Sequence, residues 1–550
     1  MKKLIVCLFS CFMLGIVSCG NDEITENMPE PLPEQPEDSP SDKPTDQPSD
    51  EPVNWHVSPN GNDENTGTEE QPFKTIQTAL GKVNPGDIIF LHEGRYYEFV
   101  IPSRSGEQNK PITIKSFPGE TAYIDGSQFE ISGWKALVHI ENVSWLTLED
   151  LHICNAIKTA VASDPTGISV RGNSKHITIR NCKVYEIKND CTRADQDAGK
   201  DWRSGHAIAV LGNNDKSSIS DLLIEKCEIY EIHSGTSESV TIAGNVDGFT
   251  IQDNYVHDVE NIGIIAAGGD NLNPGGDINV NFARNGVIRR NKVHRASMDK
   301  SQDYWGGNGS NYGAIGIYVC GSSDIIVEQN FVSECDRGIG LVSESDLLAT
   351  QNCYVRSNIV YNCFRTGIYM GDYKNFVGKG TKNCYVLNNT LYSNNRIGGA
   401  YVGEDDTTSE GELRFSENCT NNTIMNNLVY STTDRDIFFR KYWQSGSGNK
   451  IDYNHYYSTD SNSKRWMWDG QMYTDFNEWK NACGGDEHST FDFDPQFKSL
   501  DPESPDFLRL KDESPLKGKG TWMSSYFVGN EDIDGDARTD GESINIGADQ

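Results

Sequence analysis

Three short apolar runs recur in fixed order along residues 166–430, and this repeat constrains the fold more than any other feature of the 550-residue chain. Each run alternates aliphatic or β-branched residues with polar ones, as a strand with one buried face does. One turn of such a chain cannot bury its own apolar face, so neighbouring turns must stack around a shared core. The repeat therefore predicts an all-β, parallel solenoid with three strands in each of eight rungs. The second run of each rung reads ITIRN (177–181), LLIEKC (222–227), FTIQDN (249–254), GVIRRN (286–291), IIVEQN (325–330), CYVRSN (353–358), CYVLNN (384–389) and NTIMNN (422–427).

Asparagine ends most of these second runs. Its short amide side chain tolerates a left-handed backbone, and amides stacked in successive rungs can hydrogen-bond along the solenoid axis. We therefore expect a ladder of asparagines, in left-handed turns, at this corner of the rungs.

The first 19 residues predict an export signal, because two lysines precede an apolar stretch at 4–16 and the string IVSC at 16–19. The string resembles a bacterial lipobox, in which Cys19 becomes the lipidated first residue; an ordinary secretory signal is the alternative. Residues 20–53 are rich in proline and acidic residues and predict an unfolded tether. The acidic pair at 22–23 resembles surface-export signals of Bacteroidetes lipoproteins. We expect a protein held at the outer membrane by its lipid alone and displayed on the cell surface.

Residues 54–135 predict an N-terminal cap, with Phe73, Ile76 and Leu80 on one face of a short amphipathic helix. The order NGND, PFKTIQTAL, PGDIIFLHEGRYYE, PITIKSFPGE and IDG resembles the opening of secreted right-handed β-helix proteins of the pectate-lyase-like superfamily. The resemblance implies a right-handed parallel β-helix, with its body at 136–430 and closing rungs and a cap at 431–550.

The formal charge of −33 and the isoelectric point near 4.7 argue against nucleic acids and anionic membrane surfaces as partners. They leave an anionic polysaccharide open, because local basic clusters decide that interaction. Cysteines such as Cys182 and Cys227 share a register in adjacent rungs. This favours stacked thiols, with disulfides as the alternative. We expect a monomer.

Long insertions flank the first strand of the rungs, whereas the turns between the second and third strands are nearly absent. The insertions are 188–205, 233–238 and 296–313 before that strand, and 268–285, 343–352, 371–383 and 403–421 after it. Two rows of loops beside one sheet predict a groove suited to a polymer chain. Its outward residues are expected to be mostly small: Ser169, Ala207, Ala209, Ser239, Thr241, Gly263, Gly316, Gly340 and Gly367.

Three tyrosines interrupt this floor, namely Tyr318, Tyr369 and Tyr401. They are candidates for stacking against sugar rings, or alternatively pack on one another as a ladder.

Charged residues gather at the two edges of the same sheet. Arg337, Arg365 and Arg396 precede the first strand in three consecutive rungs, and Glu344, Asp372 and Glu404–Asp406 follow it. Stacked like charges are unfavourable unless neutralised. The arginines could bind sugar carboxylates and the acids a cation, or both could form ion pairs with neighbouring loops.

A second group of candidates lies in rungs two to four. β-Elimination from a uronate sugar needs a positive group beside the carboxylate and a base near C5–H. The candidate catalytic residues are Arg203, His206, Glu238, His257 and Arg284. The acidic loop residues Asp190, Asp195, Asp197 and Asp201 are the candidates for calcium. A calcium string like NADDGWD of family-nine pectate lyases is absent.

The resemblance implies a polysaccharide lyase that cleaves a uronate-containing, pectin-like glycan. A glycoside hydrolase on the same scaffold would need two carboxylates across the groove, for which Glu344, Asp372 and Glu404 are candidates. A non-catalytic glycan-binding protein is the third alternative.

Overall fold

The computed structural model describes residues 51–131, 133–158, 163–199, 203–269, 272, 276–305, 313–372, 379–396, 410–432, 436–538 and 543–550. The predicted export signal with Cys19, and all but the end of the predicted tether at 20–53, lie outside these residues. In the described part of the chain, no helix has the length and apolar content that a membrane crossing requires.

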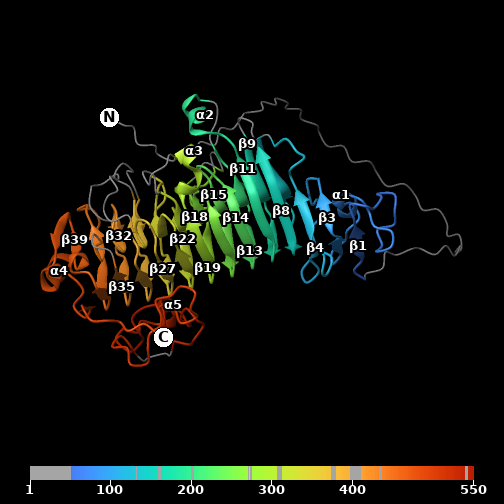
Figure 1. Cartoon of the computed structure of the whole chain (residues 1–550). Helices are drawn as coiled ribbons and strands as arrows, with labels where there is room; N and C mark the ends of the chain where they lie inside the picture. The colour runs from blue at the N-terminus through green and yellow to red at the C-terminus, as the bar shows by residue number, and fades with distance from the viewer. Residues whose placement is uncertain are drawn as a thin grey trace, which may run out of the picture.

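The described chain forms three long sheets that run side by side along one axis, so the predicted right-handed parallel β-helix is confirmed (Figure 1). Successive rungs contribute one strand to each sheet, and every strand pairs in parallel with its equivalent in the next rung, except for the final antiparallel pair β39–β40. We call the three sheets A, B and C, for the second, third and first apolar runs of the repeat.

Sheet A contains β1 (Asn54–Val57), β2 (Ile88–Leu91), β4 (Ile112–Ser116), β7 (Leu146–Glu149), β10 (Lys175–Arg180), β13 (Ile219–Glu225), β16 (Val246–Gln252), β19 (Arg284–Arg289), β22 (Ser323–Glu328), β26 (Tyr354–Arg356), β30 (Tyr385–Leu387), β34 (Thr423–Met425) and β37 (Lys450–Asp452), with the short strands β25 (Thr350–Gln351), β29 (Thr381–Lys382) and β33 (Cys419–Thr420) beside it.

Sheet B contains β3 (Gly94–Tyr96), β5 (Ala122–Asp125), β8 (Leu151–Lys158), β11 (Lys183–Asn189), β14 (Glu228–His233), β17 (Tyr255–Val259), β20 (Lys292–Ala296), β23 (Phe331–Ser333), β27 (Ile359–Tyr361), β31 (Thr390–Tyr392), β35 (Leu428–Ser431), β38 (His455–Ser458) and β41 (Thr490–Phe491).

Sheet C contains β6 (Gly133–Glu141), β9 (Ser163–Arg171), β12 (His206–Gly212), β15 (Glu238–Gly244), β18 (Ile262–Ala267), β21 (Ile315–Cys320), β24 (Arg337–Val342), β28 (Ile368–Gly371), β32 (Leu413–Phe415), β36 (Phe439–Lys441), β39 (Trp466–Trp468) and β40 (Gln471–Tyr473).

Columns of aliphatic side chains fill the interior. In sheet A one column reads Ile179, Ile224, Ile251, Ile288, Val327, Val355, Val386, Ile424 and Ile451, each paired with the next. All of them are buried. Burying one such side chain contributes about 1.5–3 kcal/mol, so stacked columns stabilise a chain with little helix.

The predicted asparagine ladder lies at the corner between sheets A and B. From Asn254 to Asn454, each ladder asparagine donates its amide N–H to the Oδ1 of the next, at 2.9–3.0 Å. The predicted left-handed conformation belongs instead to the residue before each asparagine, for example Arg290 (φ 51°) and Ser357 (φ 53°). The amide is therefore selected for its hydrogen bonds, because both its oxygen and its nitrogen are needed.

Cysteines at equivalent positions stack inside the core, as predicted. Cys353 and Cys384 lie in adjacent rungs, and the Cys353 N–H lies 3.4 Å from the Cys384 sulfur. The cysteines of the described chain are free thiols, so the alternative of disulfides is not supported there. They act as small apolar fillers.

Helix α1 (Ile76–Leu80) covers the N-terminal end of the solenoid and buries Ile76 and Leu80, as expected. The helix is shorter than predicted, since Thr75 caps it by accepting a hydrogen bond from the Thr78 N–H. Phe73 is buried in an extended segment that pairs with Val57.

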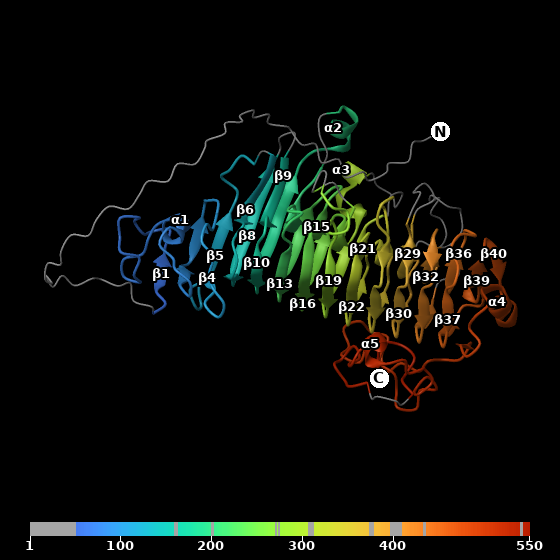
Figure 2. The ribbon, with the colours of Figure 1, turned by 180° about the vertical axis from the view of Figure 1, so that it is seen from behind.

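The C-terminal residues only partly follow the expectation of closing rungs and a cap at 431–550. Strands continue to β41, and α4 (Phe476–Cys483) packs against the last strands of sheet C. From residue 493 the chain turns back and lies along the outside of sheets A and B, on the side opposite α2 and α3 (Figure 2). There Phe507 packs on Tyr361, and Asn388 donates to the Asn545 carbonyl at 3.0 Å. This return segment, with α5 (Ser525–Val528), covers part of the outer faces of sheets A and B.

Candidate functional site

The long loops border sheet C, as predicted, except that part of the predicted insertion 403–421 forms β32 of that sheet. Those before its strands carry α2 (Arg193–Asp197), η1 (Met298–Ser301) and α3 (Gln302–Trp305), and those after its strands begin at the ends of β18, β24 and β28. Figure 2 shows α2 and α3 together on one side of the solenoid. Their side chains join, because the Tyr304 hydroxyl donates to Gln196 Oε1 at 2.6 Å. Sheet C is therefore the face that the insertions surround.

The centre of this face is buried, so the predicted open tyrosine floor is wrong. Tyr318 and Tyr369 are each 1% exposed, and their rings stack on each other at 6.4 Å. The two tyrosines thus pack on each other, which was the alternative to stacking against sugar rings. Around them lies an apolar cluster on the outer face of sheet C: Ala209, Leu211, Ala243, Ile262, Ile265, Ala267, Ile315, Cys320 and Val342.

The expected row of small outward residues divides into two rows. A Cβ on Gly316 would lie 2.5 Å from the Val332 side chain, so this glycine faces the interior corner, as Gly263 does. By register Ala207 and Ser239 belong to the inward row, whereas Ser169, Ala209, Thr241 and Gly340 face outward. A Cβ on Gly340 would lie 2.7 Å from the Tyr369 ring, which explains why glycine sits between the two tyrosines.

The outer face of β6, β9, β12 and β15 carries a polar group that we call the Trp134 cluster: Trp134, Asp164, Arg171, His206, Glu238 and Thr241. Trp134 is 45% exposed; its ring stacks on His206 at 5.3 Å, and the Arg171 guanidinium lies 4.8 Å from it. An exposed aromatic ring beside a cation, above buried acid and imidazole groups, is a combination suited to an acidic sugar.

Hydrogen bonds define the tautomer of His206. Its Nδ1 lies 2.9 Å from the Glu238 carbonyl oxygen and 2.9 Å from Thr241 Oγ1, and a carbonyl can only accept. Nδ1 therefore carries the proton and Nε2 carries the lone pair. Among the described residues, Nε2 has no hydrogen-bond partner; Asp164 Oδ1 is 3.9 Å away. Burial lowers the pKa of His206 to about 4, so the ring is neutral over the physiological range.

Two of the five predicted catalytic residues, His206 and Glu238, come together in this cluster. Thr241 connects them, since its hydroxyl donates to Glu238 Oε2 at 3.2 Å. Arg203 does not join them: it is buried and donates to the Cys191 carbonyl at 2.9 Å, to Glu260 at 3.0 Å and to Asp303 at 2.6 Å. Arg203 therefore holds the loops of α2 and α3 together.

The other two predicted catalytic residues lie on different sheets. His257 is on β17 of sheet B, where it stacks on Tyr230 at 5.2 Å and contacts Asp258 at 2.8 Å. Arg284 begins β19 of sheet A and pairs with Asp247 at 3.1 Å. The prediction of one cluster was wrong because residues close in sequence alternate among three sheets.

The predicted calcium ligands do not converge. Asp190 pairs with Lys188 at 2.9 Å, Asp195 completes the capping box of α2, and Asp197 pairs with Arg193 at 3.2 Å. Asp201 lies outside the described residues. In the part of the chain that the structure describes, no three acidic, histidine or cysteine side chains are close enough to share a metal ion. These residues do not fit a calcium site.

Arginines gather on the C-terminal rungs in a group that we call the arginine cluster: Arg337, Arg365, Glu410 and Arg414. All four are buried. Arg365 pairs directly with Glu410, Arg414 Nη1 lies 3.0 Å from Glu410 Oε2, and Arg337 Nε lies 3.8 Å from the same oxygen. Three cations from successive rungs thus surround one carboxylate, and two of them are predicted candidates.

The remaining predicted edge residues take other positions. Arg396 is exposed and lies over the Phe364 ring at 5.7 Å, apart from the arginine cluster. Glu344 accepts a hydrogen bond from the Tyr318 hydroxyl at 2.8 Å. Asp372 is buried and accepts from Asn418 at 2.9 Å; burial raises its pKa to about 6. Tyr401 and Glu404–Asp406 lie outside the described residues.

Two buried carboxyls, Glu412 and Asp436, hydrogen-bond to each other beside the arginine cluster. Glu412 also accepts from the Asn394 N–H at 2.8 Å and from its side-chain amide at 2.7 Å. Burial raises the pKa of both groups, that of Asp436 to about 6. The pair is therefore stable while it retains a proton.

This pair predicts a pH-dependent stability. Groups with raised pKa values stabilise the fold fully below their unfolded pKa, near 4, and lose that contribution as the pH rises through about 6. We expect the free energy of unfolding to fall by roughly 1–3 kcal/mol between pH 4.5 and 7 from this pair. Asp436→Asn, which supplies a permanent amide donor, should flatten the profile. Urea titrations across this range measure it, and an unchanged slope in the variant would contradict it.

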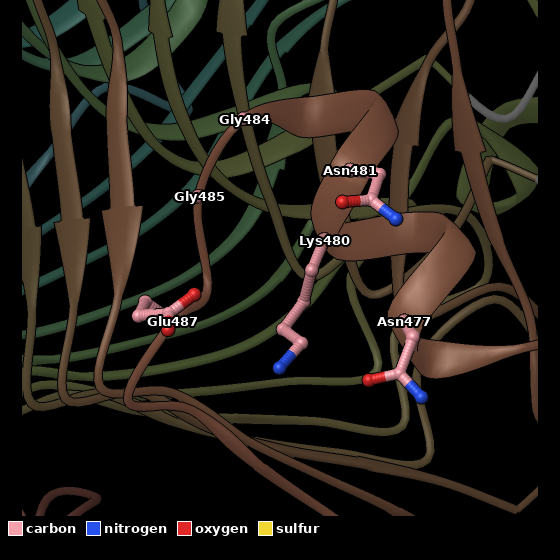
Figure 3. Close-up of a pocket in the computed structure, with 6 residues that line it drawn as sticks. All are labelled: Asn477, Lys480, Asn481, Gly484, Gly485 and Glu487. Carbon is pink, nitrogen blue, oxygen red and sulfur yellow. The ribbon is translucent and has the colours of Figure 1, made fainter.

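A surface hollow lies beside α4, at the C-terminal end of the solenoid (Figure 3), and none of its lining residues belongs to either cluster. It is lined by Asn477, Lys480, Asn481, Gly484, Gly485 and Glu487. Its side chains are polar and its charges are one lysine and one glutamate, so it offers no arrangement for catalysis.

The chain is similar in sequence and in fold to several known proteins. Residues 55–309 match the family model of the Pel9A-like right-handed β-helix region. Over 465 residues the chain is 32% identical to the uncharacterized protein YwoF of Bacillus subtilis, which spans 82% of this chain and 91% of that protein. A segment of 140 residues is 27% identical to pectate lyase PEL9 of Emericella nidulans, covering 23% of this chain and 33% of that enzyme. The crystal structure of pectate lyase Pel9A superimposes with a TM-score of 0.45 at 16% identity, over 90% of this chain and 95% of that one.

Proposed function

Because the chain belongs to the family of Pel9A-like right-handed β-helix proteins, we propose that it acts on an acidic polysaccharide along sheet C and cleaves it by β-elimination. The segment shared with a protein named pectate lyase supports this reaction class. We further propose that the protein works at the cell surface as a monomer, anchored by a lipid on Cys19.

The observation that carries the proposal is the Trp134 cluster. On the sheet that the loops surround, it combines a neutral imidazole with a directed lone pair, His206 Nε2, and an exposed indole that contacts both this imidazole and a guanidinium. Elimination needs these components: a base for the C5 proton and a cation to offset charge on the sugar carboxylate.

Each residue then has a role. Arg171 pairs with the sugar carboxylate and thereby acidifies C5–H. His206 Nε2 takes the C5 proton, and the C5–H electrons form the C4–C5 double bond. The C4–O bond breaks with its electron pair on the leaving oxygen, which takes a proton from water. Glu238 and Thr241 hold the imidazole in the required tautomer. Trp134 covers His206, so it must swing aside to admit the sugar. No step is assigned to calcium, since the described aspartates do not fit such a site.

The proposal is tested by incubating the purified protein with pectins, alginate and glycosaminoglycans, with and without a chelator. We expect new ultraviolet absorbance from the unsaturated sugar in at least one acidic polysaccharide. Reducing ends without that absorbance would identify a hydrolase. The absence of both signals would contradict cleavage of these polysaccharides.

A glycoside hydrolase remains the second candidate because of Asp372. Burial raises its pKa to about 6, which keeps a carboxyl protonated enough to act as a general acid near neutral pH. A second carboxyl, Glu344, lies on the neighbouring rung. The Ser343 N–H donates to the Gly371 carbonyl at 3.0 Å, so Ser343 is opposite Asp372 and Glu344 is one residue beyond it. In that case Asp372→Asn would abolish the reducing ends, while His206→Asn would leave them.

A further inference from the structure

The arginine cluster has the composition of a carboxylate-binding site that is already filled. Arg337, Arg365 and Arg414 come from three successive rungs, and all three approach the Glu410 carboxylate. Cations gathered in this way repel one another, and the Glu410 carboxylate among them offsets that repulsion. Glu410 lies outside the three strands of its rung, in the loop that leads into β32.

Glu412, two residues after Glu410, is fixed by its own contacts. Glu412 is held by Asn394 and Asp436, and strand β32 follows at once. Gly411, between the two glutamates, has a φ of 79°, a conformation in which glycine is unstrained and other residues are not. Displacement of Glu410 would therefore require rotation of the backbone at Gly411, with Glu412 held in place.

The cluster also lies on the same face as the Trp134 cluster. Arg414 continues the outward row that contains Gly340 and Tyr369. Four strand spacings separate β12, with His206, from β24, with Arg337, which is about 19 Å along the axis. A polysaccharide that reaches His206 can extend over this distance.

We propose that the arginine cluster is a binding subsite for the carboxylate of a uronate sugar, and that Glu410 occupies it as an internal competitor until the glycan displaces it. The ligand class rests on the proposed function, but the competition does not require cleavage. A tethered carboxylate has a high effective concentration, so it lowers the apparent affinity for an external one.

The test is calorimetric titration with oligogalacturonate, oligoalginate and a neutral oligogalactan. It uses the His206→Asn background, so that the probes are not consumed. We expect Glu410→Gln to bind one of the uronate probes about tenfold more tightly or better, and the neutral probe no differently. Glu410→Asp, which keeps the charge on a shorter side chain, should gain less. Asp346→Asn, which removes an exposed charge beyond the end of β24, is the matched control and should change nothing.

Thermal melting provides a second readout if Glu410→Gln is less stable. Uronate should raise the melting temperature of this variant more than that of the unsubstituted chain, because it replaces the missing carboxylate. Equal affinities, an equal gain in Asp346→Asn, or no uronate binding by any variant would overturn the proposal. Absence of unsaturated products from the unsubstituted chain would instead overturn the lyase function alone.

Discussion

His206→Asn should lower the rate of polysaccharide cleavage by about 10²–10⁴-fold, the usual contribution of a positioned general base. Asparagine can still donate to the Glu238 carbonyl oxygen, but it offers no lone pair of comparable basicity where Nε2 lies. The loss should appear in kcat and kcat/KM equally, since proton abstraction occurs only in the transition state. Initial rates of ultraviolet absorbance increase measure it.

The pH profile adds a second check on the same residue. The lowered pKa of His206, about 4, keeps the imidazole unprotonated at pH 5, where an ordinary histidine would be mostly protonated. We expect the acid limb of the activity to fall near pH 4 and not near pH 6.5. His257→Asn is the matched control, because His257 has a similar stacked ring on sheet B and should retain full activity. Full activity in His206→Asn would exclude this residue as the base.

Asn358→Ala should destabilise the solenoid by about 3–5 kcal/mol, the range for breaking a buried hydrogen-bond network. The Asn358 amide donates to the Val327 carbonyl at 2.9 Å and to Asn389 Oδ1 at 3.0 Å. Its oxygen accepts from the backbone and side-chain N–H groups of Asn330 at 2.9 and 3.0 Å. Alanine leaves these partners buried without replacements, since the corner is closed to water.

Urea denaturation followed by circular dichroism measures this loss. Asn60→Ala, at an exposed position in the N-terminal cap, should change the stability by less than about 0.5 kcal/mol. An equal, small effect at both positions would show that the ladder contributes nothing beyond packing.

The candidate site could be predicted only in part. His206, Glu238, Arg337 and Arg365 were identified because they lie at or beside strands of the repeat, where periodicity places them on sheet C. Trp134 was missed because it lies before the first recognisable rung, where no repeat set its register. Glu410 and Arg414 were missed because Arg414 was not aligned with Tyr369. The string GELRF (411–415), read in register with TGIYM (366–370), would have revealed Arg414.

The sequence also did not predict that the C-terminal segment turns back and packs on the outside of the solenoid. Residues such as Leu508 and Leu510 alternate with polar residues as strand residues do, and pattern alone assigns them to further rungs. In the structure they pack on the outer faces of Tyr361 and Tyr430, which the repeat shows only as outward positions of sheet B. Surface complementarity decides which distant segment covers a row of outward aromatic residues. Local periodicity carries no information about such long-range packing.

By itself, the sequence determined the parallel solenoid, the three sheets, the asparagine ladder and the sheet that the loops surround. These follow from local alternation and repeat length, because each rung can bury its apolar residues only against the next. Only the tertiary structure decided that the tyrosines are buried, that His206 and His257 lie on different sheets, and that Glu410 sits among three arginines. Those outcomes depend on where strands turn a corner and on how loops fold back, and both are set by contacts between residues far apart in the chain.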